Sequence, residues 1–331
     1  MTVIDVVLHP DVVRDLRTVT ELVESASAER GVTGRVTVSE DVCGADGDVV
    51  VVPASGDTID IPADGRCVVR VDYGPVDVDR SPGLRAHITG RGLAGLRYAI
   101  DAVVHHRRHP AEVVSYGDHS DQRIEVRGSG AVNVALIHGG YWRTRWTLDL
   151  MDAIAIDLAE RGYQTWNIEY RRPDKHGWAA TTSDIDAAMS TIEGTTVIMG
   201  HSAGGQLALR WAADNSPALA VSLAGVLDLE TADNRWLGEG AVSMALGSRY
   251  TDAFASSSPR ARLPLGVPQI VVCAEADDPN LNDIGRDYVA AAQRAGDDVT
   301  LVEGPGGHFA VVDPRSEIWQ SILHSVEDRL R

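Results

Sequence analysis

The pentapeptide Gly-His-Ser-Ala-Gly at residues 200–204 constrains this chain more than any other part of its sequence. An apolar run, residues 197–199, precedes it, and a helix-compatible run, residues 206–211, follows it. A serine on a sharp turn between a strand and a helix needs glycines on both sides, because side chains there would clash. The context favours this arrangement over a chance Gly/Ser loop. It predicts a nucleophilic Ser202, with the free N–H of Ala203 facing a developing oxyanion.

A second glycine-rich turn lies upstream, where the apolar run at residues 132–137 leads into His-Gly-Gly-Tyr-Trp at residues 138–142. Two adjacent glycines let backbone N–H groups approach a substrate oxygen closely. Taken alone, this segment is typical of an ordinary turn that ends a strand. Together with the serine turn, it predicts Gly139 and Gly140 as oxyanion donors, with the N–H of Tyr141 as a substitute.

The acid and the histidine of a catalytic triad are expected after the serine, in that order. The run at residues 267–273 is typical of a buried parallel strand and ends at an acidic cluster, residues 275–278. Functional residues of parallel sheets gather at such strand ends. A further short strand leads into a Gly/Pro-rich loop that carries His308, the predicted general base. The alternative is a surface histidine, but His324, the only later histidine, lies in a helical pattern.

At this point the chain resembles a known group. The His-Gly-Gly-Tyr-Trp, Gly-His-Ser-Ala-Gly-Gly, Asp-Asp-Pro and Gly-His-Phe segments are similar to α/β-hydrolases of the group containing kynurenine formamidase (arylformamidase) and related bacterial carboxylesterases. Further similarities lie at residues 167–172, 177–178 and 222–226. The resemblance covers residues 115–331 and implies an α/β-hydrolase fold with Ser202 as nucleophile, Asp277 as acid and His308 as base. It implies neither a cofactor nor a metal ion.

The residues after Asp277 depart from this resemblance. This chain has Asp-Pro-Asn-Leu at residues 278–281, where formamidases tend to have serine, proline, an acid and phenylalanine. The acid is therefore either Asp277 or Asp278. We expect a serine hydrolase that cleaves a small ester or aryl amide, with formamidase activity first and carboxylesterase activity on short acyl esters second. A ligand-binding receptor or scaffold with the same fold is the alternative from another class.

The composition limits the partners of the chain. A formal net charge of −18 disfavours nucleic acids and anionic membrane surfaces, so a small-molecule substrate is expected. The three cysteines are widely separated and lack metal-ligand spacing, which favours reduced thiols in a cytoplasm. The first ten residues do not have the pattern of a signal peptide, and no run is long enough to span a bilayer. Self-association as a homodimer stays open.

The periodicity predicts two domains. Residues 111–331 alternate strands and helices, which indicates a mostly parallel sheet covered on both faces. Within them, Ser183 is expected to cap a helix, and residues 227–263 form either a partial lid or a surface excursion. Residues 1–110 predict a small α/β accessory domain of two helices and four strands. Its basic, histidine-rich end at residues 105–110 favours a solvated linker over a metal or phosphate site.

Several side chains near the motifs bear on the substrate. Tyr141, Trp142 and Trp178 are candidates to wall an acyl or aryl pocket. An amino-acid substrate would also need an arginine to bind its carboxylate. Three arginines are placed for this, although a surface position is favoured for each of them: Arg143, Arg171 and Arg172.

Overall fold

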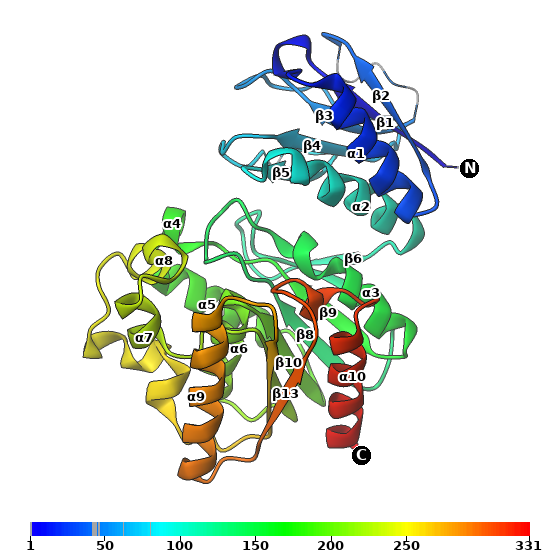
Figure 1. Cartoon of the computed structure of the whole chain (residues 1–331). Helices are drawn as coiled ribbons and strands as arrows, with labels where there is room; N and C mark the ends of the chain where they lie inside the picture. Colours follow the sequence, from blue (N-terminus) through cyan, green and yellow to red (C-terminus); the bar gives the residue numbers. More distant parts are fainter. Residues whose placement is uncertain (1, 42–44, 46, 62, 80) are drawn as a thin grey trace. The chain divides into compact units, whose positions relative to one another are not determined.

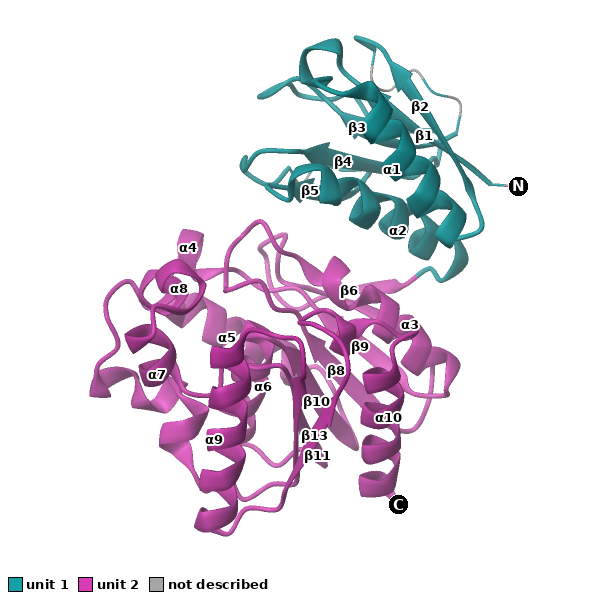
Figure 2. Cartoon of the chain, viewed as in Figure 1, with its two compact units in different colours: residues 1–110 teal, residues 111–331 magenta. Residues whose placement is uncertain are grey.

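The computed structural model describes residues 2–41, 45, 47–61, 63–79 and 81–331 (Figure 1). The chain divides into two compact units, residues 1–110 and 111–331 (Figure 2). This division falls at the same residue as the boundary placed from the sequence. Cys43 lies outside the described residues, and Cys67 and Cys273 are buried free thiols.

Unit 1 is a parallel sheet with two helices. The strand order is β2-β1-β3-β4-β5, and every pairing is parallel. The helix α1 begins where Asp15 accepts a hydrogen bond from the N–H of Thr18, and both helices bury an apolar stripe in the core of this unit. The bounds are β1 (Val3–Leu8), α1 (Leu16–Glu29), β2 (Thr33–Val38), β3 (Asp48–Val52), β4 (Val68–Asp72), β5 (Leu84–Thr89) and α2 (Gly95–Arg108).

Two features of unit 1 differ from the sequence-based expectation. The strand β1 was not predicted, although five of its six residues are buried. In addition, α2 continues through the basic and histidine-rich run, so these side chains form the last turn of a helix rather than a linker. Cationic side chains in the last turn of a helix interact favourably with the helix dipole. This interaction explains why α2 extends to Arg108.

Unit 2 contains an eight-stranded sheet in the order β13-β12-β11-β10-β8-β9-β7-β6. Near one edge, β7 pairs antiparallel with both β6 and β9, and the other neighbouring strands of this sheet pair in parallel. The strands are β6 (Glu112–Ser115), β7 (Arg123–Arg127), β8 (Asn133–Ile137), β9 (Gln164–Ile168), β10 (Thr196–His201), β11 (Leu219–Leu223), β12 (Gln269–Ala274) and β13 (Val299–Gly304). The helices are α3 (Asp152–Glu160), α4 (Pro173–His176), α5 (Trp178–Met189), α6 (Ala203–Ala212), α7 (Leu229–Asn234), α8 (Leu237–Leu246), α9 (Pro279–Ala295) and α10 (Glu317–Leu330).

Helices cover both faces of this sheet (Figure 1). Alternate residues of each central strand point to opposite faces, so Ala135 and Ile137 join the core beneath α5, α6 and α9, whereas Val134 and Leu136 join the core beneath α3 and α10. Strands buried on both faces are apolar throughout, as the sequence showed. The predicted mostly parallel α/β sheet is therefore confirmed.

One local prediction in unit 2 was wrong, and two strands were not predicted. The helix α5 begins at Trp178 with Gly177 before it, so Ser183 lies inside the helix and does not cap it. The strands β6 and β7 carried too short a pattern to be recognised.

The carboxyl ends of the parallel strands place the sequence motifs at one edge of the sheet. His138 follows β8, Ser202 follows β10, and the acidic cluster follows β12. Among the described residues, every helix is too short or too polar to cross a lipid bilayer.

Candidate active site

Ser202 sits on a tight turn between β10 and α6. Its backbone has φ 55° and ψ −118°, a conformation that is strained for a residue with a side chain. The neighbouring glycines make the turn possible. A Cβ atom on Gly200 would lie 2.0 Å from the carbonyl oxygen of Gly204, and one on Gly204 would lie 2.1 Å from that of Ile137. The predicted strand, turn and helix are present.

His308 and Asp277 meet beside this turn. Nδ1 of His308 donates a hydrogen bond to Oδ2 of Asp277 over 2.8 Å, and the Asp277 side chain is 4% exposed. A carboxylate can only accept, so the proton of the neutral ring is on Nδ1 and Nε2 keeps its lone pair. Asp278 is the N-cap of α9 instead, accepting from the backbone N–H of Asn280 over 2.9 Å. Asp278, the other candidate for the catalytic acid, thus caps a helix.

His201, which the sequence analysis did not single out, connects the serine turn to the histidine loop. Its Nε2 donates to the backbone oxygen of His308 over 3.0 Å, and the two ring centroids are 4.6 Å apart. Burial, followed by the nearby His308, holds the pKa of His201 well below its ordinary value, so its ring is neutral at pH 7. His201 therefore acts as a fixed donor that holds the His308 loop against the serine turn.

The predicted oxyanion donors also converge on Ser202. A Cβ atom on Gly139 would lie 2.8 Å from Cβ of Ser202, so the two turns are in contact. Gly140 has φ 108°, which only glycine adopts readily. Within the described part of the chain, no hydrogen-bond acceptor is recorded for the N–H groups of Gly139, Gly140 and Ala203. These three donors remain available for a substrate oxygen.

Two of the three predicted pocket side chains have structural partners. Trp142 is 1% exposed, and its Nε1 donates to Oε1 of Gln206 over 3.1 Å. It lies in the core, so its expected place in a pocket wall is corrected. Half-buried Trp178 packs edge-to-face on Trp142 and donates to Oγ of Ser257 over 2.8 Å. Trp178, at the start of α5, is thus linked directly to the 252–257 turn, and Trp142 is linked to it through Gln206, whose Nε2 donates to the oxygen of Ser257 over 2.7 Å.

Tyr141 keeps a place at the site. It is half-buried, and burial, followed by Asp278 and Asp277, raises the pKa of its phenol. Two aromatic residues that the sequence analysis did not assign to the substrate lie beside the site. Trp146 is the side chain that a Cβ on Gly140 would strike, and Phe309 is 45% exposed with its ring 5.4 Å from that of His308. The centroids of Trp146 and Phe309 are 6.4 Å apart.

The segment at residues 227–263 is ordered into α7, α8 and two 3₁₀ turns. It packs on the oxyanion side of the site, because a Cβ on Gly238 would strike the ring of Tyr141. Nη2 of Arg143 also donates to the oxygen of Gly238 over 2.9 Å. These contacts favour the partial lid over a surface excursion.

The arginines considered for carboxylate binding are mostly engaged. Arg171 makes a forked pair with Asp184, with its Nη2 at 2.7 Å from Oδ1. Arg172 is fully buried between Glu169 and Asp121, so its expected surface position was wrong. Arg143 is the one of the three that lies beside the lid and Tyr141.

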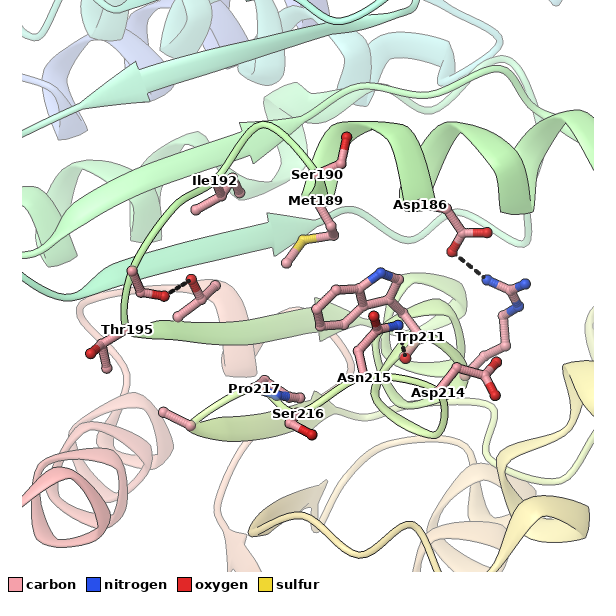
Figure 3. Close-up of a pocket in the computed structure, with 14 residues that line it drawn as sticks. Asp186, Met189, Ser190, Ile192, Thr195, Trp211, Asp214, Asn215, Ser216 and Pro217 are labelled. Atoms are coloured by element: carbon pink, nitrogen blue, oxygen red, sulfur yellow. Dashed lines mark hydrogen bonds and ion pairs between the residues drawn. The ribbon is translucent and has the colours of Figure 1, made fainter.

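A pocket of about 970 Å³ lies at the opposite end of the sheet (Figure 3). Thr196, where β10 begins, and Ala218, just before β11, line it together with Trp211. It therefore opens at the amino ends of these strands, whereas Ser202 lies at the carboxyl end of β10. The catalytic groups around Ser202 therefore identify the site, and the volume of this pocket does not.

One cluster among the described residues has the side chains of a metal site. The ligand atoms of His119, Asp121 and His176 lie within 4.8 Å of one another. Oδ2 of Asp121, however, accepts from Nη2 of Arg172 over 3.1 Å. A guanidinium already bound to the only carboxylate opposes the entry of a cation, so we assign no metal to this cluster.

The glycine contacts make a testable prediction. We expect Gly204→Ala to lower the free energy of unfolding by at least about 1–3 kcal/mol, because the new methyl group would overlap the backbone of β8. Gly307→Ala is the matched control, since its Cβ would meet only an ordinary contact at 3.6 Å. Urea unfolding of both variants measures the difference. Equal stability of the two variants would contradict the close approach.

Comparisons with known proteins agree with this fold. Residues 134–312 match a family model described as the alpha/beta hydrolase fold. No curated protein matches the chain significantly. Similar solved structures include esterase B of Lactobacillus rhamnosis (17% identity, TM-score 0.56, 66% of this chain and 84% of that one). They also include the propionate-bound esterase Est2 of Thermogutta terrifontis (21%, 0.54, 66% and 93%) and a bacterial heroin esterase (19%, 0.54, 67% and 85%). The family match spans more than half of the chain, which therefore belongs to the alpha/beta hydrolase fold family and is a serine hydrolase.

Proposed function

We propose that this protein is a carboxylesterase that cleaves small esters through an acyl-enzyme on Ser202. The observation that carries the proposal is the hydrogen bond from His308 to Asp277, made beside a serine on a strained strand-to-helix turn. Strained backbone of this kind clusters at active sites. The structures of esterases from other organisms add support at the level of the fold.

The mechanism follows from these groups. Nε2 of His308 takes the proton of the Ser202 hydroxyl as its oxygen attacks the ester carbonyl. Asp277 keeps the ring in the tautomer that this requires and stabilises the imidazolium that forms. The tetrahedral oxyanion accepts hydrogen bonds from Gly139, Gly140 and Ala203. His308 then returns the proton to the leaving alcohol, and water hydrolyses the acyl-enzyme by the same route. The mechanism uses no metal ion or cofactor.

A formamidase that acts on an aryl amide is the second candidate. The observation in its favour is the pair of neighbouring aromatic rings beside His308 and Gly140, Phe309 and Trp146, on which an aromatic leaving group would stack. N-formylkynurenine also carries an amino-acid carboxylate. Arg143 is the arginine near the site that could pair with it, since Arg171 and Arg172 are held by acidic side chains.

The assignment of the acid is testable. We expect Asp277→Asn to lower kcat for p-nitrophenyl acetate by about three to four orders of magnitude, because the ring loses its tautomer control. Asp278→Asn is the matched control. Asparagine caps helices as well as aspartate does, so its kcat and Tm should stay close to those of the unmodified protein. The reverse ranking of the two variants would move the acid to position 278.

The choice of substrate is decided by direct comparison. We expect kcat/KM for p-nitrophenyl acetate to exceed that for N-formylkynurenine, and both activities to survive EDTA. A higher value for N-formylkynurenine would establish the formamidase instead. Binding of either compound without turnover would point to a receptor or scaffold. Ser202→Ala, assayed in parallel, separates turnover at this site from background hydrolysis.

A further inference from the structure

The Glu-Tyr pair at residues 169 and 170 has no part in the mechanism above, yet it lies directly beneath the oxyanion turn. The strands β8 and β9 pair in parallel, with Ile137 opposite Ile168. His138 and Glu169 directly follow the ends of these two strands, and their side chains are in contact. Glu169, Tyr170 and His138 are all completely buried.

Glu169 is surrounded by donors. Its Oε1 accepts from Nε2 of His138 over 3.0 Å and from the backbone N–H of Tyr170 over 3.1 Å, and it also pairs with Nη1 of Arg172. Its Oε2 accepts from the N–H of Leu148 over 3.2 Å. Burial on its own would raise the pKa of Glu169, but Arg172 and His138 outweigh burial and hold the pKa well below its ordinary value. The side chain is therefore a carboxylate at neutral pH.

This carboxylate fixes the orientation of the His138 ring. Nε2 of His138 faces Oε1 of Glu169, and Nδ1 lies 2.9 Å from the oxygen of Gly139. The ring therefore bridges the Glu169 carboxylate and the carbonyl of Gly139. Because Glu169 holds one side of the ring, the other side keeps the carbonyl of Gly139 in a fixed direction.

The fixed carbonyls in turn aim the N–H groups. In a trans peptide the C=O and the N–H point in opposite directions. The C=O of Gly139 points at Nδ1 of His138, so the N–H of Gly140 points the other way. The C=O of His138 accepts from the hydroxyl of Tyr170 over 2.9 Å, and this aims the N–H of Gly139. The Tyr170 ring also stacks on His138, with centroids 4.5 Å apart.

We propose that Glu169 and Tyr170 are positioning residues that set the two oxyanion N–H groups of the His138 turn before substrate arrives. Glu169 acts through the orientation of the His138 ring on the Gly140 N–H, and Tyr170 acts through the His138 carbonyl on the Gly139 N–H. Neither residue contacts the substrate. This inference rests on the proposed esterase mechanism and names a device on which that mechanism depends.

The test uses two substitutions in the full-length chain. Glu169→Gln keeps the size of the side chain but removes the carboxylate that holds the His138 ring, so the direction of the Gly139 carbonyl is no longer fixed. Tyr170→Phe removes one hydroxyl and no charge. Glu125→Gln is the matched control, because Glu125 is equally buried beside an arginine, with its Oε2 3.0 Å from Nη2 of Arg127, but lies on β7 away from the turn.

Two readouts separate positioning from stability. The first is kcat and KM for p-nitrophenyl acetate. The second is the affinity of a trifluoromethyl ketone, whose carbonyl carbon bonds to Oγ of Ser202 while the serine proton passes to His308 and the carbonyl oxygen becomes the oxyanion. We expect each substitution to lower kcat and the ketone affinity together, by about tenfold to a hundredfold, with KM little changed. Glu125→Gln should lower Tm and leave both quantities as they were.

Values of kcat and ketone affinity within twofold of the unmodified protein, in folded Glu169→Gln and Tyr170→Phe, would overturn the inference. An equal loss in Glu125→Gln would also overturn it, because the effect would then be one of stability. If Glu169→Gln fails to fold, Tyr170→Phe decides alone. An unmodified protein that neither turns over the ester nor binds the ketone would overturn the proposed function itself, and the inference with it.

Discussion

The close approach of the first turn of α6 to the end of β8 is the constraint on which the rest of the site depends. Only a residue without Cβ can occupy position 204, where a methyl group would lie 2.1 Å from the oxygen of Ile137. This approach places Ser202 and the N–H of Ala203 directly beside the His138 turn. This one close approach therefore requires glycine at three positions: 139, 200 and 204. The close approach also requires a strained backbone at Ser202. The packed strands and helix around this residue hold it in that conformation.

A layer of charge lies beneath this contact. Glu169, Arg172 and Asp121 alternate in sign, His138 contacts Glu169, and all four side chains are buried. Removing such groups from water is costly, and a row of apolar side chains would often be as stable or more so. Although buried charged groups add little stability, they make hydrogen bonds with fixed directions. Here His138 of this layer contacts the carbonyl of Gly139, and the neutral hydroxyl of Tyr170 donates to the carbonyl of His138, so both carbonyls of the turn have fixed directions.

The sequence predicted the groups that lie on motifs. The strand, turn and helix around Ser202, the glycines after β8 and the positions of Asp277 and His308 all follow local patterns, and the structure brings them to one edge of the sheet. Other features depend on which strands become neighbours. His138 meets Glu169 because β9 pairs with β8, and His201 meets the His308 loop across the site. A linear pattern does not contain these contacts.

Local chemistry could also mislead. Trp142 follows the oxyanion turn, which suggested a pocket wall, but its positive φ of 56° directs the indole into the core toward Gln206. Arginine is usually a surface residue, but Arg172 is buried, and its charge is compensated by Glu169 and Asp121. Asp277 and Asp278 are adjacent and chemically identical. Only the start of α9 at Pro279 assigns the capping role to Asp278.

The acyl-enzyme is the central claim of this account, and its capture tests that claim most directly. The protein would be mixed with p-nitrophenyl acetate, quenched in acid within the first turnover and digested for peptide mass spectrometry. We expect an initial burst of p-nitrophenol close to one per protein molecule and an acetyl group on Ser202. An acetyl group on another residue, or turnover with no acetylated peptide in the quenched samples and no burst, would contradict the account.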